Sequence, residues 1–228
     1  MKFLGIIPAR SGSQTIKNKN LKTFNNKPLI YWTIKAAKNS KYLNHFILST
    51  NCKKIASVGK KYGADVPFLR SNKLAKSSTN MHDVMKDLIK KYDEIKNFDA
   101  VVLLQPTSPL RTSKDIDKGC KLFLKNKPDS LISVNKLKHS KNPEDLYKIK
   151  NKFLIPTLNN KKIYLKQKKK VYFSTNGSLY FTKTNRLKKF IIGGKIIGME
   201  MSDIKSIDID YEYEFKLAEL IMKNKFPH

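Results

Sequence analysis

Short apolar runs alternate with amphipathic stretches along the first 135 residues. The apolar runs predict buried strands at 3–8, 46–49, 65–69, 100–104 and 131–134. Between them, apolar side chains recur three and four positions apart, which predicts helices at 28–37, 52–62 and 80–92. Asn80 and Ser113 are the expected N-caps of two helices, the second of which fills the gap before residue 131.

Strands that alternate with helices of about ten residues favour right-handed βαβ crossovers. The expected fold class is therefore α/β, with a Rossmann-like, mostly parallel mixed sheet between two layers of helices. Ligands bind beyond the carboxyl ends of the strands in such sheets. The loops at 10–20 and 105–111 each follow a predicted strand, so we expect them to share one cleft.

The alternation breaks between residues 136 and 170. This stretch contains twelve lysines and two acids, Glu144 and Asp145, with short apolar pieces at 153–155 and 163–165. It predicts a small antiparallel excursion from a single domain that spans residues 1–228. Strand-like segments return at 178–182 and 195–201, and a final helix is expected at 211–223. The residues of that helix predicted to face inward are Phe215, Leu217, Ala218 and Ile221.

Composition sets limits on the class of protein. Hydrophobic residues make up 40% of the 228 positions, which is enough for a buried core. No apolar run approaches the ~18 residues of a membrane span, and no signal-peptide pattern opens the chain, so we expect a cytoplasmic protein. Cys52 and Cys120 lack the spacing of a zinc site or a disulfide framework.

The formal net charge of +29 raises the possibility of nucleic-acid binding. Of the 47 basic residues, however, only four are arginines, the side chain best suited to bidentate contacts with bases and phosphates. The excess of lysine favours a solvated surface. A basic protein that binds nucleic acid through residues 136–170 stays as an alternative.

The loop after the first strand offers groups for a polyphosphate. Its Ser-Gly-Ser at 11–13 allows close approach of the backbone, and Arg10, Lys17 and Lys19 add positive charge. The spacing of a P-loop or of a dinucleotide fold is absent from this segment. An ordinary polar turn is therefore the alternative interpretation.

Two further segments carry candidate chemistry. In the loop at 105–111, two prolines hold Gln105 and Thr107 at the cleft, and Arg111 could instead pair with an acid in a structural turn. In an extended segment, Asp208 and Asp210 point to the same side and could bind one hard cation such as Mg²⁺. Asp210 could otherwise serve only as the N-cap of the final helix.

Five blocks along the whole chain resemble, in order, the motifs of the acylneuraminate cytidylyltransferases, also called CMP-sialic acid synthetases. The blocks are IPARSGS at 7–13, KNL at 19–21, LLQPTSPLR at 103–111, NGSLY at 176–180 and SIDID at 206–210. The related enzyme that activates Kdo has a similar first loop but lacks the QPTSPLR and SIDID blocks, so it is a poorer fit. The resemblance implies a nucleotide-diphosphosugar-transferase-like α/β fold and a homodimer in which residues 136–170 of one subunit reach the sugar site of the other.

The resemblance also implies a reaction: CTP and a nine-carbon 2-keto acid sugar give the CMP-sugar and pyrophosphate. Legionaminic or pseudaminic acid are the alternative sugars to N-acetylneuraminate. The nucleotide-binding residues that it implies are Arg10, Ser11, Gly12, Ser13, Lys19, Asn20 and Arg70. The sugar-binding residues are Gln105, Lys166, Asn176 and Tyr180, the Mg²⁺ ligands are Asp208 and Asp210, and the catalytic residues are Arg10, Lys19 and Asp210.

A few positions depart from the family pattern. Gln14 stands where a lysine is usual, Lys17 where a proline often follows, and Asn51 where an aspartate is usual. An Arg-Gln pair ahead of the NG block is Lys166-Gln167 in this chain, which keeps the charge but loses the bidentate fork. We expect these changes to affect triphosphate binding and sugar identity rather than the type of reaction.

Overall fold

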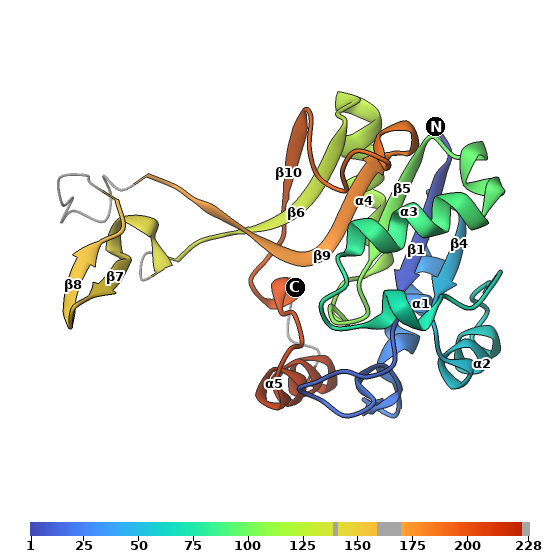
Figure 1. The fold of residues 1–228 in the computed structure, drawn as a ribbon, viewed down its shortest axis with the longest axis horizontal. Coiled ribbons are helices and arrows are strands. Elements are labelled where there is room, and N and C mark those ends of the chain that lie inside the picture. Colours follow the sequence, from blue (N-terminus) through green and yellow to red (C-terminus); the bar gives the residue numbers. More distant parts are fainter. Residues whose placement is uncertain (139–140, 159–169, 225–228) are drawn as a thin grey trace.

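The computed structural model describes residues 1–138, 141–158 and 170–224 and contains a central six-stranded sheet (Figure 1). In sheet order, the strands are β10 (Ile196–Glu200), β6 (Ser130–Lys136), β9 (Phe173–Lys183), β5 (Ala100–Leu104), β1 (Phe3–Pro8) and β4 (Leu43–Ser49). β1 pairs in parallel with β4 and β5, and β10 pairs in parallel with β6. β9 runs antiparallel to both neighbours. The predicted mixed, mostly parallel sheet is confirmed.

Helices pack on both faces of this sheet. On one face, α1 (Leu29–Lys38), α2 (Lys53–Lys61) and α4 (Ser113–Asn126) share a buried cluster with the strands. On the other face, α3 (Met81–Lys91) forms a second cluster. α5 (Glu212–Lys223) packs with the first loop and the small hairpin of β2 (Thr23–Phe24) and β3 (Lys27–Pro28). None of the helices in the described ranges is long and apolar enough to cross a membrane.

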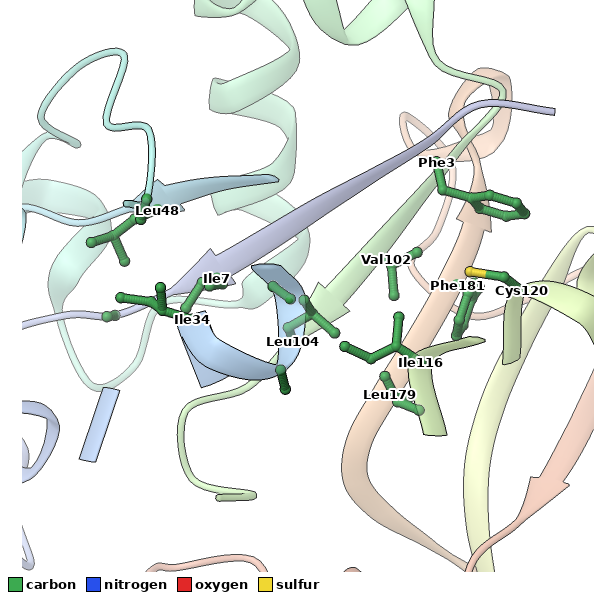
Figure 2. Packing of buried hydrophobic residues seen from close by; sticks show 14 of the residues in the cluster. Phe3, Ile7, Ile34, Leu48, Val102, Leu104, Ile116, Cys120, Leu179 and Phe181 are labelled. Atoms are coloured by element: carbon green, nitrogen blue, oxygen red, sulfur yellow. The ribbon is translucent and has the colours of Figure 1, made fainter. Parts of the chain in front are cut away.

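The larger cluster contains three phenylalanines in contact, of which Figure 2 labels Phe3 and Phe181. The ring of Phe3 meets the rings of Phe123 and Phe181 edge-on, with centroids 6.0 and 6.2 Å apart. Phe123 and Phe181 stack at 5.9 Å. Strand β1, strand β9 and helix α4 are thus joined at one point, which fixes the antiparallel strand within the sheet.

The predicted excursion is a separate antiparallel hairpin of β7 (Tyr147–Lys150) and β8 (Phe153–Pro156). Figure 1 shows it at the end of two long arms that continue from β6 and β9, far from the main sheet. The register pairs Ile149 with Leu154, so that both side chains lie on one face of the hairpin, 78% and 65% exposed. The hairpin thus presents an apolar face to solvent.

Three predictions at the level of elements are wrong. Residues 65–69 form two isolated bridges rather than a strand, one to Ile47 of β4 and one to Thr50 just after β4, since Pro67 has no N–H to donate to a ladder. Leu217 is 46% exposed. It lies two positions after the buried Phe215, so its side chain points about 200° away from that of Phe215 around the helix axis. The N-cap of α4 is Thr112 rather than Ser113.

Candidate active site

A cleft of about 340 Å³ opens where β1 and β5 end. It is lined by the first loop, by the 105–107 turn and by residues between 70 and 84, so the shared cleft predicted for the two loops is confirmed. The predicted site residues that line it are Arg10, Ser13, Lys19, Asn20, Arg70, Gln105 and Asp210. A larger hollow of about 770 Å³ includes Met1 and Phe98, which precede β1 and β5. It therefore lies at the amino ends of these strands, opposite the cleft.

The first loop is held in shape by its own polar groups. Arg10 Nη1 donates to the Gly12 carbonyl at 2.8 Å, and Asn20 Nδ2 donates to the Arg10 carbonyl at 3.0 Å. Gly12 has φ +79°, which favours glycine at this turn. Ser11 and Gly12 line an adjoining hollow of about 570 Å³, which shares Arg10 and Asn20 with the cleft.

Two of the departures from the family pattern near this loop, Asn51 and Gln14, form uncharged hydrogen bonds across the site. Asn51 Oδ1 accepts from the Ser11 N–H at 3.0 Å, while its Nδ2 donates to Ser11 Oγ at 2.9 Å and to Asn72 Oδ1 at 3.0 Å. Gln14 Nε2 donates to Ser77 Oγ at 3.2 Å. The first loop is thereby joined to the segment at 72–77 without an ion pair.

Positive charge is concentrated on one wall of the cleft. Arg70 is only 5% exposed, and burial together with the nearby positive charge of Arg10 lowers its pKa. Arg70 Nε is buried and has no hydrogen-bond partner among the described residues. Two guanidinium groups held close to each other favour an anionic ligand between them, because the anion relieves their repulsion.

Lys19 connects the first loop to the segment that carries the two aspartates. Its Nζ donates to the Ile209 carbonyl at 2.6 Å and lies 3.3 Å from Asp210 Oδ1. The Lys19 side chain is mostly buried, whereas Asp210 is exposed at the cleft. The structure therefore brings a predicted phosphate-binding cation and a predicted metal ligand into direct contact.

Asp208 occupies a very different environment from Asp210. Burial raises its pKa and the negative charge of Asp210 raises it further, while the nearby Thr107 hydroxyl lowers it. The Thr107 hydroxyl and the carboxyl group fall short of full hydrogen-bonding geometry, so Asp208 Oδ1 and Thr107 Oγ1 both stay without a partner in the described part of the chain. On the opposite side of the segment, Ile209 is fully buried against α5.

These two carboxylates fit a hard divalent cation. One buried, unpartnered carboxylate oxygen beside a second carboxylate is a donor set that Mg²⁺ prefers. Three or more clustered His, Cys, Asp or Glu side chains do not occur among the described residues, so other ligands would complete the coordination shell. The alternative for Asp210 is wrong, because the N-cap of α5 is Tyr211.

Arg111 lies behind the cleft as a structural residue. Its guanidinium is almost fully buried and donates to the Gln105 carbonyl at 3.2 Å, to the Ser178 carbonyl at 2.7 Å and to Thr33 Oγ1 at 2.9 Å. Burial lowers its pKa to about 10, although the charges of Asp115 and Asp208 act in the opposite direction. The loop that carries Gln105 is thus fixed to β9 and α1.

Asn176 and Tyr180, the other predicted sugar-binding residues in the described part of the chain, lie outside the lining of the cleft. Asn176 is 5% exposed, and its side chain is hydrogen-bonded to Ser206, Ser133 and Ser178. Tyr180 is partly buried, and its pKa is raised by burial and by the charge of Asp208, which lies close by. Lys166 and Gln167 fall outside the described residues, so the role of Lys166 stays a prediction.

Comparisons with known proteins agree with this site. The family model described as "Cytidylyltransferase" matches residues 4–225. The chain is 33% identical to the CMP-N,N'-diacetyllegionaminic acid synthase of Legionella pneumophila over 98% of this chain and 97% of that protein. It is 31% identical to the N-acylneuraminate cytidylyltransferase of Escherichia coli O18:K1:H7, over 98% of this chain and 53% of that longer protein.

The fold also matches a solved structure. CMP:2-keto-3-deoxy-manno-octonic acid synthetase complexed with CTP superimposes with a TM-score of 0.73 at 13% identity, covering 99% of this chain and 100% of that one. At such low identity the likeness shows the fold alone. It confirms the expected nucleotide-diphosphosugar-transferase-like architecture.

Proposed function

Because this chain belongs to the cytidylyltransferase family, we propose that it transfers CMP from CTP to the anomeric hydroxyl of a nine-carbon 2-keto acid sugar and releases pyrophosphate. The observation that carries the proposal is that Arg10, Arg70, Lys19 and Asp210 line one cleft. The named relatives act on sugars of this class and match nearly the whole chain. The family accounts for residues 4–225, so we propose no separate nucleic-acid function.

The first loop binds the nucleotide in this proposal. Arg10, Ser13 and Lys19 would hold the triphosphate, Asn20 the ribose, and Arg70 would approach the cytosine, with Ser11 and Gly12 supplying backbone groups. What supports these roles is that five of these side chains line one cleft and that its cations suit a polyanion. Gln105, which lines the same cleft after β5, would contact the sugar together with Tyr180.

Asp208 and Asp210 would hold Mg²⁺. When bound, the ion would neutralise charge that accumulates on the phosphates during the reaction. Lys19 supplies a second positive charge at the same place, because its ammonium group lies between the first loop and Asp210. Both groups favour the transition state by electrostatics, so no covalent nucleophile on the protein is needed.

The chemical step balances as an in-line displacement. The anomeric oxygen of the sugar forms a bond to the α-phosphorus of CTP, the bond from that phosphorus to the oxygen that bridges it to the β-phosphorus breaks, and pyrophosphate leaves. The proton of the sugar hydroxyl leaves to water or to the Asp210 carboxylate, which is exposed at the cleft. Arg10 stabilises the leaving pyrophosphate.

The enzyme is a homodimer in this proposal. The exposed apolar face of the β7–β8 hairpin, with Ile149 and Leu154 at its centre, supports a partner that covers it, and a second copy would carry the same face. Residues 136–170 of one subunit, with Lys166, would complete the sugar site of the other. A cytoplasmic location is part of this proposal, because the substrate CTP is a cytoplasmic metabolite.

Release of pyrophosphate tests the proposal directly. We expect turnover with CTP and Mg²⁺ for at least one member of a panel that contains N-acetylneuraminic, legionaminic, pseudaminic and 2-keto-3-deoxyoctonic acids. ATP, GTP and UTP should give no turnover with the same sugar. Equal rates with UTP would contradict a cytidylyltransferase, and turnover with the eight-carbon acid alone would contradict the sugar class.

A further inference from the structure

The Asn-Gly turn of β9, at residues 176–177, contacts the segment that carries Asp208 and Asp210, called the aspartate segment. Gly177 has φ +73°, and a Cβ atom added there would lie 2.6 Å from Asp208 Oδ2. The space that a side chain would fill is therefore occupied by the Asp208 carboxylate. Asn176, one residue earlier, has its amide directed toward the 3-10 turn at Ile204–Ser206, which precedes Asp208.

A chain of hydrogen bonds connects β6 and β9 to the 3-10 turn at Ile204–Ser206. Ser133 Oγ donates to Asn176 Oδ1 at 2.5 Å, and the Ser178 N–H donates to the same oxygen at 3.2 Å. Asn176 Nδ2 donates to Ser206 Oγ at 2.9 Å, and Ser206 Oγ donates to the Ser202 carbonyl at 2.8 Å. β6 and β9 shift register between Ile132 and Val134, where Ser133 leaves the regular ladder to make this contact.

The ends of the aspartate segment are fixed separately. Lys205 Nζ binds the Asp115 carboxylate of α4 at 2.8 and 3.0 Å. The Ile209 N–H donates to the Thr107 carbonyl at 2.8 Å. Asp208 lies between these anchors, and Asn176 holds the residue two positions before it.

We propose that Asn176 and Ser206 position the Asp208 carboxylate for the divalent cation, so that the Asn-Gly turn of β9 supports the metal site. In this role Asn176 is a positioning residue, because it acts on Asp208 through its hydrogen bond to Ser206. Its burial and its engaged oxygen both favour this role. The inference rests on the proposed function, because it takes Asp208 as a ligand of Mg²⁺.

Position 206 requires a side chain that can both accept and donate a hydrogen bond. A hydroxyl both accepts from Asn176 and donates to the Ser202 carbonyl, so one short side chain closes the turn and ties it to the sheet. Partners behind a metal ligand commonly change metal affinity by 10- to 100-fold when they are removed. We therefore expect the effect of Ser206 to appear in metal binding rather than in sugar binding.

The test compares Ser206→Ala, Asn176→Ala and the double variant with the wild-type enzyme. Binding of Mn²⁺ alone is followed by loss of the free-ion EPR signal, and the Mg²⁺ concentration for half-maximal rate and the KM for the sugar are measured in parallel. Ser206→Ala should weaken Mn²⁺ binding about tenfold and raise the Mg²⁺ requirement similarly, with the sugar KM within twofold of wild type. The double variant should be little worse than either single one.

Two further variants sharpen the comparison. Ser206→Thr keeps the hydroxyl and should restore Mn²⁺ affinity. Ser202→Ala, in the same turn, leaves the carbonyl that accepts from Ser206 and, within the described part of the chain, removes only the long contact of 3.5 Å from the Lys205 N–H, so it should match the wild type. If Asn176→Ala does not fold, Ser206→Ala and Ser206→Thr still decide the question.

The outcomes separate this inference from the proposed function. Wild-type Mn²⁺ affinity in Ser206→Ala, or a raised sugar KM with unchanged metal affinity in Asn176→Ala, would overturn the positioning role alone. If Asp208→Asn binds Mn²⁺ as tightly as the wild type and needs no more Mg²⁺, the metal assignment fails and the positioning role with it. Pyrophosphate release by the wild type reports on the reaction independently of both.

Discussion

The carboxylate of Asp208 is kept in an environment that disfavours its charge. Burial raises its pKa above the ordinary value of 3.8. The folded protein therefore binds this proton more tightly than the unfolded chain. The stability that comes from the protonated form is complete below the ordinary pKa and is lost as the pH rises through the raised value. Above that raised value, the ionised group destabilises the metal-free fold.

Replacing Asp208 by Asn should separate stability from activity. We expect kcat to fall by ~10²-fold or more, because one carboxylate is lost from the cation site. The metal-free variant should melt no lower than the wild type at pH 7, and the difference between the two should shrink toward pH 4 as the wild-type carboxyl group becomes protonated. Melting curves at several pH values check this, and a variant that melts well below the wild type at pH 7 would contradict it.

Some residues of the site could be predicted from the sequence and others could not. Arg10, Lys19, Asn20 and Asp210 stand in short motifs next to strand ends, and the structure brings them to one cleft. Thr33, Ser133 and Ser206 support the site by hydrogen bonds that span 30 to 78 residues of sequence. Contacts of that kind leave no pattern in a single sequence, because isolated serines and threonines occur everywhere.

At the scale of elements, the N-terminus of α4 offers a direct test of helix capping. Asp115 Oδ2 accepts from the Thr112 N–H at 2.8 Å and from Thr112 Oγ1 at 2.6 Å. Burial raises the pKa of Asp115, but the hydrogen bonds from Lys205 and Thr112 outweigh it, and the pKa is lowered. The carboxylate is thus ionised where it stabilises both the helix and the 3-10 turn before Asp208.

Thr112→Ala should lower the free energy of unfolding by about 1 kcal/mol. Ser113→Ala is the matched control, because Ser113 already lies within the helix and its loss should change stability by less than about 0.5 kcal/mol. Urea denaturation of both variants measures the difference. Equal losses of stability in the two variants would contradict the assignment of Thr112 as the N-cap.

Gly177→Ala tests the contact between β9 and the aspartate segment. A side chain at φ +73° costs about 1–2 kcal/mol, and its Cβ would also displace Asp208 Oδ2. Gly63→Ala carries a similar strain at φ +91°, but its Cβ would meet only the flexible end of Lys38 at 3.5 Å, far from the cleft. Both variants should lose stability in urea, and only Gly177→Ala should raise the Mg²⁺ requirement. A normal Mg²⁺ requirement in Gly177→Ala would contradict the contact.

The elements that the sequence predicted well are those with a strong period. β1 and β5 coincide with their apolar runs, and α3 begins after Asn80 as expected, with its side chain accepting from the His82 N–H. Residues 65–69 have the composition of a strand but not its hydrogen bonds, since Pro67 interrupts them. The antiparallel place of β9 between β5 and β6 depends on long-range packing that no local pattern records.

At the scale of the whole molecule, charge has a direct consequence for association. The chain carries +29, whereas CTP and a sugar acid are both anions. Long-range attraction raises the rate of encounter and is screened over about 8–10 Å at physiological salt. We expect kcat/KM for CTP to fall steeply between about 20 and 300 mM monovalent salt while kcat changes little. A flat kcat/KM over this range would show that the net charge has no part in substrate capture.

The β7–β8 hairpin provides the test of assembly. Ile149→Lys with Leu154→Lys places two charges on the apolar face of the hairpin without touching the main sheet. Lys148→Gln is the matched control, because Lys148 lies on the opposite face of the same strand. In light scattering at micromolar concentration, the double variant should be a monomer and the control a dimer.

The same variants connect assembly to catalysis. If the hairpin of one subunit completes the sugar site of the other, the monomeric variant should retain CTP binding, since the nucleotide loop and Arg70 belong to the main body. Its turnover should fall at least tenfold with a higher KM for the sugar, and Lys166→Ala should raise the sugar KM more than the CTP KM. Full activity of a monomeric variant would contradict a sugar site shared between subunits, and a dimeric double variant would show that the contact between subunits lies elsewhere.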